Sequence, residues 1–186
     1  RFRVRGMRHK GDGNNAYRLE QETAGRKKQE PFSIAREAQH GGMMPTYFTL
    51  KEMTSTDTGL PNAPQTWGQY SNMLMVANFL DGLRKWFGGP IVVTSGFRSP
   101  AVNERVGGSN TSAHLDGLAV DIKPKSGLHA DYMRILDYLY PLVTCHRIDQ
   151  LIVYCKTPQR PDLGVKWIHI GFREDSADNR CQTIYK

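Results

Sequence analysis

Large apolar side chains are sparse in the first part of this chain and become regularly spaced only from Tyr47 onward. Residues 1–44 mix Arg, Lys, Gly, Asn, Gln and Glu, so they cannot bury enough surface to offset the entropy lost on ordering. Residues 1–45 also carry +5 of the formal net charge of +7. We therefore expect a flexible basic extension over residues 1–44, with a short helix at 30–39, and one folded domain over residues 45–186.

Composition excludes several classes of protein. The three cysteines are odd in number and follow no CxxC spacing, which argues against a disulfide framework. No stretch approaches the roughly 20 apolar residues of a membrane span, and the first residues are too basic for a secretory signal. We expect a monomer that is made in the cytoplasm and has no membrane partner. The folded part is nearly balanced in charge, so nucleic-acid binding is expected only as an alternative that works through the Arg-rich start of the extension.

The apolar spacing predicts an α+β fold. Apolar residues at helical spacing predict helices over 66–87 and 130–143, and Ser99-Pro100 resembles the start of a brief helix that ends before Gly107-Gly108. Residues 91–95, 118–122, 149–155 and 165–172 have the composition of short strands, and the last two are expected to pair antiparallel across a loop at 157–164 and to complete the domain. Without a repeating βαβ rhythm, this order predicts a small, mainly antiparallel sheet packed with helices.

Two histidines and an aspartate fall on turns and strands in a way that suits a metal site. In the stretch SAHLDGLAVD, which starts at Ser112, His114 precedes a glycine turn and Asp121 lies on a strand whose apolar neighbours point the other way. Near the C-terminus, His169 alternates with Ile168 and Ile170. Two imidazoles and one carboxylate on rigid strands suit a catalytic zinc ion, which commonly takes three protein ligands and leaves a position for water.

These residues resemble the zinc D-Ala-D-Ala carboxypeptidases and the related phage L-Ala-D-Glu endopeptidases, whose fold is shared with vancomycin-resistance dipeptidases and the hedgehog signalling domain. The similarity covers about residues 47–172. The matching motifs are SxHxxGxAxD from Ser112 to Asp121, the later Trp167-Ile168-His169, Phe48 to Glu52, and Val93 to Pro100 followed by Asn103. The resemblance implies a hedgehog/DD-peptidase-like fold and a zinc metallopeptidase that hydrolyses cell-wall peptides.

The resemblance also implies individual roles. His114, Asp121 and His169 would bind one zinc ion, and Arg98 would bind a substrate carbonyl or stabilise the oxyanion. Ser112 would help to position the substrate, unless it only caps a turn.

The carboxylate that the family uses as general base is missing from both of its usual positions. Lys166 stands three residues before the last histidine, and Tyr154 stands where the preceding strand would carry a glutamate. Asp149, Asp162 and Asp116 could substitute as the base, whereas Tyr154 could act only as a hydrogen-bond donor at neutral pH. We take Arg98, Tyr154 and Asp149 as the candidate catalytic residues.

Two functions are compatible with this pattern. The first is a phage-encoded, endolysin-type peptidase, made without a signal peptide, that cuts peptidoglycan stem peptides in the bacterial cell wall as a carboxypeptidase or an endopeptidase. The second is a catalytically silent relative that keeps the zinc ion, binds wall peptides or serves a structural role in a virion, and is suggested by the missing carboxylate.

Overall fold

The computed structural model describes residues 44–186, and the following account is confined to them. The expected extension, apart from its last residue, and the helix expected at 30–39 lie outside the described residues. No helix in the described range is long and apolar enough to cross a membrane.

The longest element is helix α4 (Trp67–Phe87), which the apolar spacing predicted. Its first turn is closed by a capping box, in which the Thr66 side chain accepts from the Gln69 backbone and the Gln69 side chain accepts from the Thr66 backbone. It ends at Gly88, whose φ of 75° is the left-handed conformation that glycine adopts without strain. The buried side of α4 is formed by Tyr70, Met73, Val76, Ala77, Leu80, Asp81, Leu83 and Phe87.

The other helices expected within the described range and the first two expected strands are confirmed, and each of their ends lies within two residues of its expected position. Ser99 caps a brief helix that has Pro100 as its first residue, as its sequence indicated. In chain order the other elements are α3 (Leu50–Met53), β1 (Ile91–Ser95), α5 (Pro100–Arg105), η2 (Ala113–Asp116), β2 (Ala119–Pro124), α6 (His129–Thr144), β3 (Gln150–Thr157), β4 (Arg160–Gly171), η3 (Ser176–Asp178) and β5 (Gln182–Tyr185).

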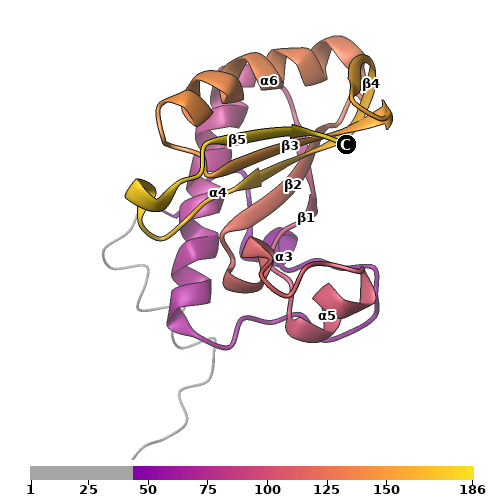
Figure 1. Cartoon of the computed structure of the whole chain (residues 1–186). Coiled ribbons are helices and arrows are strands. Elements are labelled where there is room, and N and C mark those ends of the chain that lie inside the picture. The colour runs from indigo at the N-terminus through magenta and orange to yellow at the C-terminus, as the bar shows by residue number, and fades with distance from the viewer. Residues whose placement is uncertain (1–43) are drawn as a thin grey trace, which may run out of the picture. The chain divides into compact units, whose positions relative to one another are not determined.

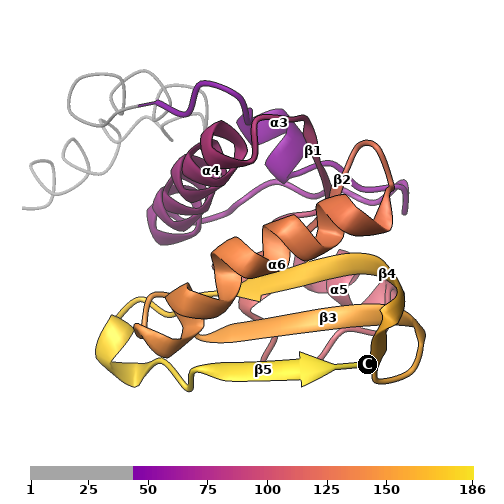
Figure 2. The same cartoon turned by 90° about the horizontal axis from the view of Figure 1, so that it is seen from above.

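The strands form one five-stranded sheet in the order β1-β2-β4-β3-β5, in which every pair is antiparallel except β3 with β5. Helices α4 and α6 lie on one side of this sheet (Figures 1 and 2). The fully buried side chains of the three central strands fill the core: Val120, Ile122, Leu151, Val153, Ile168 and Ile170. Because side chains alternate along a strand, the other face carries Asp121, Ile152, Tyr154, Trp167 and His169. The expected α+β fold with a mainly antiparallel sheet is confirmed.

Two expectations about the end of the domain are wrong. The loop expected at 157–164 is a tight turn at residues 158–159, and β4 already begins at Arg160. The first residues of β4, from Arg160 to Leu163, are largely exposed, so they lack the alternation of buried apolar and exposed polar residues that marks a strand. The hairpin also does not complete the sheet, because β5 follows and pairs parallel to β3. Its residues, Gln182–Tyr185, are only partly buried and too few to give a recognisable pattern.

Candidate metal centre

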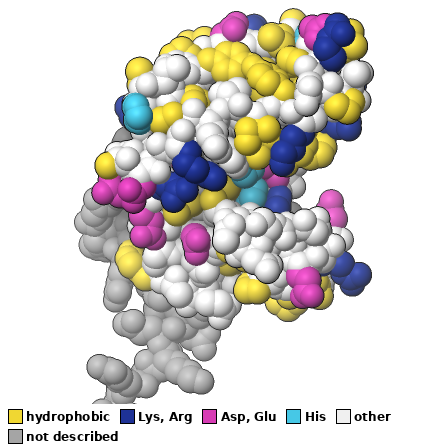
Figure 3. Space-filling model, in the orientation of Figure 1, with side chains coloured by type: hydrophobic (Ala, Val, Ile, Leu, Met, Phe, Trp, Pro, Cys, Tyr) yellow, Lys and Arg dark blue, Asp and Glu magenta, His cyan; other side chains and the backbone are white. Residues whose placement is uncertain are grey.

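The sheet face that carries Asp121 and His169, opposite the helices, forms one side of a cleft with a volume of about 1120 Å³. Figure 3 shows this cleft as a hollow with histidine at its bottom and basic side chains above it. The opposite side is made by the chain between α5 and η2, where Gly108, Ser109 and Thr111 line the cleft. The cleft therefore has a polar, uncharged side on this loop, whereas its sheet side carries Ile152, Tyr154 and Trp167 together with Asp121 and His169.

His114, Asp121 and His169 meet in this cleft although they are far apart in sequence. Asp121 and His169 are directly paired across β2 and β4, and the Asp121 Oδ1 atom lies 2.8 Å from His169 Nδ1. His114 Nε2 lies 3.2 Å from His169 Nδ1 and 3.4 Å from Asp121 Oδ1. One potential ligand atom from each residue thus lies within 4.8 Å of the other two, so that the group could hold a single metal ion.

The turn that carries His114 is held from two sides. The His114 Nδ1 atom is 2.6 Å from the Gly96 carbonyl oxygen, and since a carbonyl only accepts, Nδ1 carries the proton and leaves Nε2 to face the other two residues. From α4, the Gln69 amide donates to the Leu115 carbonyl and the Asn72 amide donates to the Asp116 carbonyl. These bonds fix both the tautomer and the orientation of the His114 ring.

The charge states of the group suit a cation. Burial lowers the pKa of His114, so its imidazole is neutral at neutral pH and Nε2 has a free lone pair. Burial alone would raise the pKa of Asp121, but the hydrogen bond with His169 and the interactions with the two nearby imidazoles outweigh it and hold the pKa well below its usual range. Two imidazole nitrogens and a carboxylate oxygen this close together repel each other unless a proton or a cation lies between them. The donor set therefore fits a divalent metal ion.

Arg98 borders the group and is tied to it through both its backbone and its side chain. Its backbone N–H donates to the His114 carbonyl. Its Nη2 donates to Asp121 Oδ2 at 2.7 Å, and its Nε donates to the Ser95 hydroxyl at 2.8 Å. Nη1 makes no hydrogen bond with any of the described residues. Arg98 therefore has one nitrogen left to face the cleft, which it lines.

Tyr154 lies on the same face of the sheet as His169 and also lines the cleft. Its ring stacks on Trp167 with centroids 4.3 Å apart and planes 18° apart, which fixes the direction of its hydroxyl. Burial raises the pKa of Tyr154, and the negative charge of Asp121 raises it further, so the phenol stays protonated at neutral pH. Ser112 also lines the cleft, and its side chain does not cap the short helix η2 that follows it.

Asp149, the carboxylate expected among the catalytic residues, is bound by arginines. It lies just before β3, where its carboxylate accepts from Arg173 Nε, from the Arg180 backbone N–H and from the Arg180 guanidinium. The structure therefore does not bring Asp149 into hydrogen-bond contact with His114 or His169. The other two alternatives differ: Asp162 pairs with Arg160 in the exposed part of the hairpin, and Asp116 is exposed at the end of η2.

The arrangement around Asp149 predicts an acid-sensitive contribution to stability. Burial alone would raise its pKa, but the hydrogen bonds from Arg180 and Arg173 lower it to about 2. A lowered pKa means that this carboxylate stabilises the fold above a pH of about 4 and that the contribution is lost as the pH falls through about 2. We expect Asp149→Asn to lower the free energy of unfolding at pH 7 by roughly 2 kcal/mol, measured by urea denaturation.

Asp162→Asn is the matched control for this measurement, because Asp162 is also paired with an arginine but is exposed. It should leave the urea midpoint unchanged, since exposed ion pairs contribute little. The difference between the Asp149→Asn variant and the unmodified protein should shrink as the pH is lowered from 4 to about 2. Equal stability of the two proteins at pH 7 would contradict the assignment.

An α+β domain with a His-Asp-His group at the bottom of an open cleft defines a metallopeptidase-like class of protein. Residues 46–142, more than half of the chain, match the profile of the family described as Peptidase M15. The chain therefore belongs to the Peptidase M15 family, which comprises D-Ala-D-Ala carboxypeptidases and L-Ala-D-Glu endopeptidases, and the resemblance seen in the sequence is confirmed. No curated protein matches the chain in sequence.

The matched region contains His114 and Asp121 but ends before His169. The third member of the group is therefore identified by its position across from Asp121 on β4 rather than by the family match. Ser95, Gly96, Gln69 and Asn72, which hold the group in place, were not singled out from the sequence. Only the glycine could have been suspected, because a glycine directly after a buried strand indicates a close approach of another part of the backbone.

Proposed function

We propose that this protein is a zinc-dependent peptidase that cleaves peptidoglycan stem peptides in the bacterial cell wall. The observation that carries the proposal is the convergence of His114 Nε2, Asp121 Oδ1 and His169 Nδ1 in an open cleft. Two imidazoles and a carboxylate form a ligand set that zinc uses in catalytic sites. Membership of Peptidase M15 supports a peptide as substrate, and the D-Ala-D-Ala carboxypeptidases and L-Ala-D-Glu endopeptidases of that family favour cell-wall peptides in particular.

In such a site zinc supplies an activated water and polarises the carbonyl of the peptide bond. The chain's own residues would do the remaining work. The protonated Tyr154 hydroxyl would donate a hydrogen bond to the oxygen that becomes negatively charged, and Arg98 Nη1 would donate to the same oxygen or to a neighbouring carbonyl. The Ser112 hydroxyl, on the opposite side of the cleft, would hold the peptide backbone.

The proposal is tested by incubating the purified chain with bacterial peptidoglycan and zinc, and by measuring the released amino groups and fragments. We expect release that stops when a chelator removes the metal and returns when zinc is added back. Free D-alanine among the products would indicate a carboxypeptidase, whereas larger fragments would indicate an endopeptidase. No release at any zinc concentration would contradict the peptidase proposal.

A second candidate is a catalytically silent member of the family that binds wall peptides. The observation in its favour concerns the carboxylates that line the cleft. Asp121 belongs to the ligand group and Asp149 is held by two arginines. The other acidic residues of the lining, Asp116, Glu174, Asp175 and Asp178, are exposed, and none forms a hydrogen bond with His114 or His169. This candidate predicts that stem peptides bind to the zinc-loaded protein without being cut.

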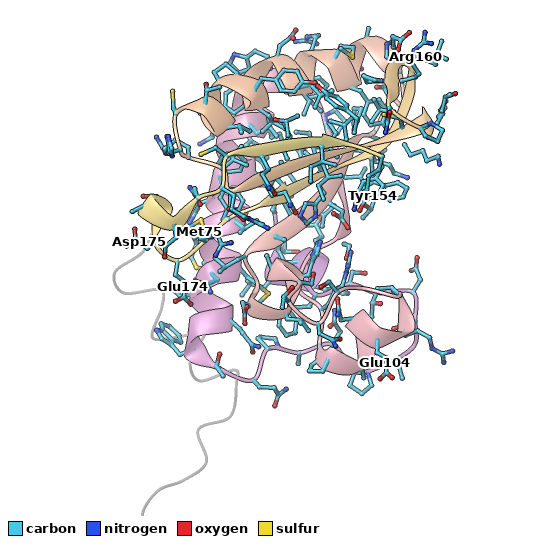
Figure 4. The ribbon with its side chains drawn as sticks, viewed as in Figure 1. Met75, Glu104, Tyr154, Arg160, Glu174 and Asp175 are labelled. Carbon is cyan, nitrogen blue, oxygen red and sulfur yellow. The ribbon has the colours of Figure 1, made fainter. Side chains whose placement is uncertain are left out.

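The Tyr154→Phe variant measures how much the Tyr154 hydroxyl contributes to the rate of peptide hydrolysis. We expect kcat to fall by about 10- to 100-fold, because one hydrogen bond to a charged group is removed, while zinc binding stays stoichiometric. Tyr138→Phe is a matched control, since Tyr138 also packs on a tryptophan, Trp86, but on the helical side of the domain. Figure 4 shows Tyr154 within the sheet, with Glu174 and Asp175 beyond one end of the strands. An unchanged kcat would exclude Tyr154 from catalysis.

A further inference from the structure

The two oxygens of the Asp121 carboxylate have different partners. Oδ1 faces the imidazoles, at 2.8 Å from His169 Nδ1 and 3.4 Å from His114 Nε2. Oδ2 accepts from the Arg98 guanidinium at 2.7 Å and makes no hydrogen bond with either imidazole. The carboxylate is thus divided between a group that can bind a metal ion and a group that can only donate hydrogen bonds.

The guanidinium that holds Oδ2 is itself fixed in direction. Arg98 Nε donates to the Ser95 hydroxyl, and Ser95 is paired with Asp121 across β1 and β2 after an irregularity in the register that follows Val93. The Arg98 backbone N–H donates to the carbonyl of His114, another member of the group. The planar guanidinium therefore spans Ser95 and Asp121 with two different nitrogens, an arrangement that the single ammonium of a lysine could not reproduce. The Arg98 side chain is only 16% exposed, so water competes weakly for this contact.

A carboxylate that is free at both oxygens can bind one metal ion through either oxygen or through both. We propose that Arg98 is a positioning residue that occupies Oδ2 and leaves Asp121 to bind the metal ion through Oδ1 alone. This keeps the number of protein donor atoms at three, so that a water molecule and a peptide carbonyl can also be bound. The inference rests on the proposed function and adds to it a role for Arg98 that does not involve contact with the substrate.

Cobalt(II) is a suitable probe, because the intensity of its visible absorption depends on the number of donor atoms around it. The full chain is loaded with one equivalent of cobalt in the absence of any peptide, so that the measurement does not depend on peptidase activity. We expect Arg98→Met to bind cobalt and to show a visible absorption several-fold weaker than that of the unmodified protein, since the second oxygen of Asp121 raises the number of donor atoms.

Two milder variants keep the test decisive if Arg98→Met fails to fold. Arg98→Lys keeps the positive charge but not the two-nitrogen contact, and Ser95→Ala removes only the bond that orients the guanidinium. Both variants should also show a weaker visible absorption than the unmodified protein, but the decrease should be smaller than in Arg98→Met. Arg160→Met is the matched control, because Arg160 binds Asp162 through Nε and Nη2 far from the site, and its spectrum should equal that of the unmodified protein.

Spectra of the Arg98 and Ser95 variants identical to that of the unmodified protein would overturn the positioning role and leave the proposed function intact. A failure of the unmodified protein to bind cobalt or zinc would instead overturn the proposed function itself. The two failures are therefore distinguishable in one series of titrations.

Discussion

The His114→Ala variant is expected to lose stoichiometric zinc binding together with peptidase activity, which should fall by about 10³-fold or more. Three protein ligands are the minimum with which catalytic zinc sites are usually built, and His114 is the most deeply buried of the three, at 2% exposed. Its Nε2 has no role in the core, because the ring is anchored through Nδ1 to the Gly96 carbonyl. The activation that zinc supplies is worth several kcal/mol, and each 1.4 kcal/mol corresponds to about a factor of ten in rate.

The measurement pairs a zinc titration by calorimetry with the release of amino groups from peptidoglycan. His129→Ala is the control, since His129 is exposed at the start of α6 and should behave like the unmodified protein in both assays. A His114→Ala variant that still binds one zinc ion tightly would show that the ion is bound elsewhere. Retained hydrolysis by that variant would show that the reaction does not use this group.

The Gly96→Ala variant is expected to be less stable by about 3 kcal/mol or more and to bind zinc more weakly. A Cβ atom at this position would lie 2.2 Å from the Met53 carbonyl oxygen and 2.9 Å from its carbon, and both are backbone atoms. The neighbouring Phe97 N–H donates to that same Met53 carbonyl, so the two segments cannot separate without losing a buried hydrogen bond. The carbonyl of residue 96 would move with its backbone, and with it the acceptor that orients His114.

Thermal unfolding followed by circular dichroism gives the stability, and we expect Tm to fall by roughly 6 to 12 °C. Gly82→Ala is the control, and its expected effect on stability has the opposite sign. Gly82 lies exposed in the middle of α4, and the nearest atom to an added Cβ is the Tyr138 hydroxyl at 4.0 Å. That substitution should raise stability by about 0.5 to 1 kcal/mol, because alanine favours the helix. Equal Tm values for the two variants would contradict the steric argument.

The ligand group could be predicted from the sequence because each member lies in a segment with a strong local pattern. Asp121 and His169 alternate with fully buried apolar residues, which fixes the face on which they lie. The sequence could not show the partners of Arg98 and Asp149. An arginine after a turn can face solvent or a carboxylate, and only the folded chain brings Arg98 to Asp121, 23 residues away. Asp149 is bound by residues after β4, in a segment with no regular pattern.

Parts of the fold could likewise be predicted from local sequence patterns, and other parts could not. The helix over 66–87 carries its own signals at both ends, and the strand at 91–95 is short, β-branched and bounded by proline and glycine. Strand β5 depends on the edge of β3 for its hydrogen bonds, so its four residues carry little information by themselves. The exposed arm of the β3–β4 hairpin likewise depends on its partner strand rather than on apolar spacing.

The pairing of β2 with β4 has one more consequence. Asp121 and His169 face each other as cross-strand partners, so a slip of the pairing by one residue would turn one of the two side chains toward α4 and α6. Misaligned sheets would therefore lack the complete ligand set. An ion that requires all three donors would bind only chains whose central strands are correctly aligned, and the proportion of metal-loaded molecules in a preparation would report how many have folded properly.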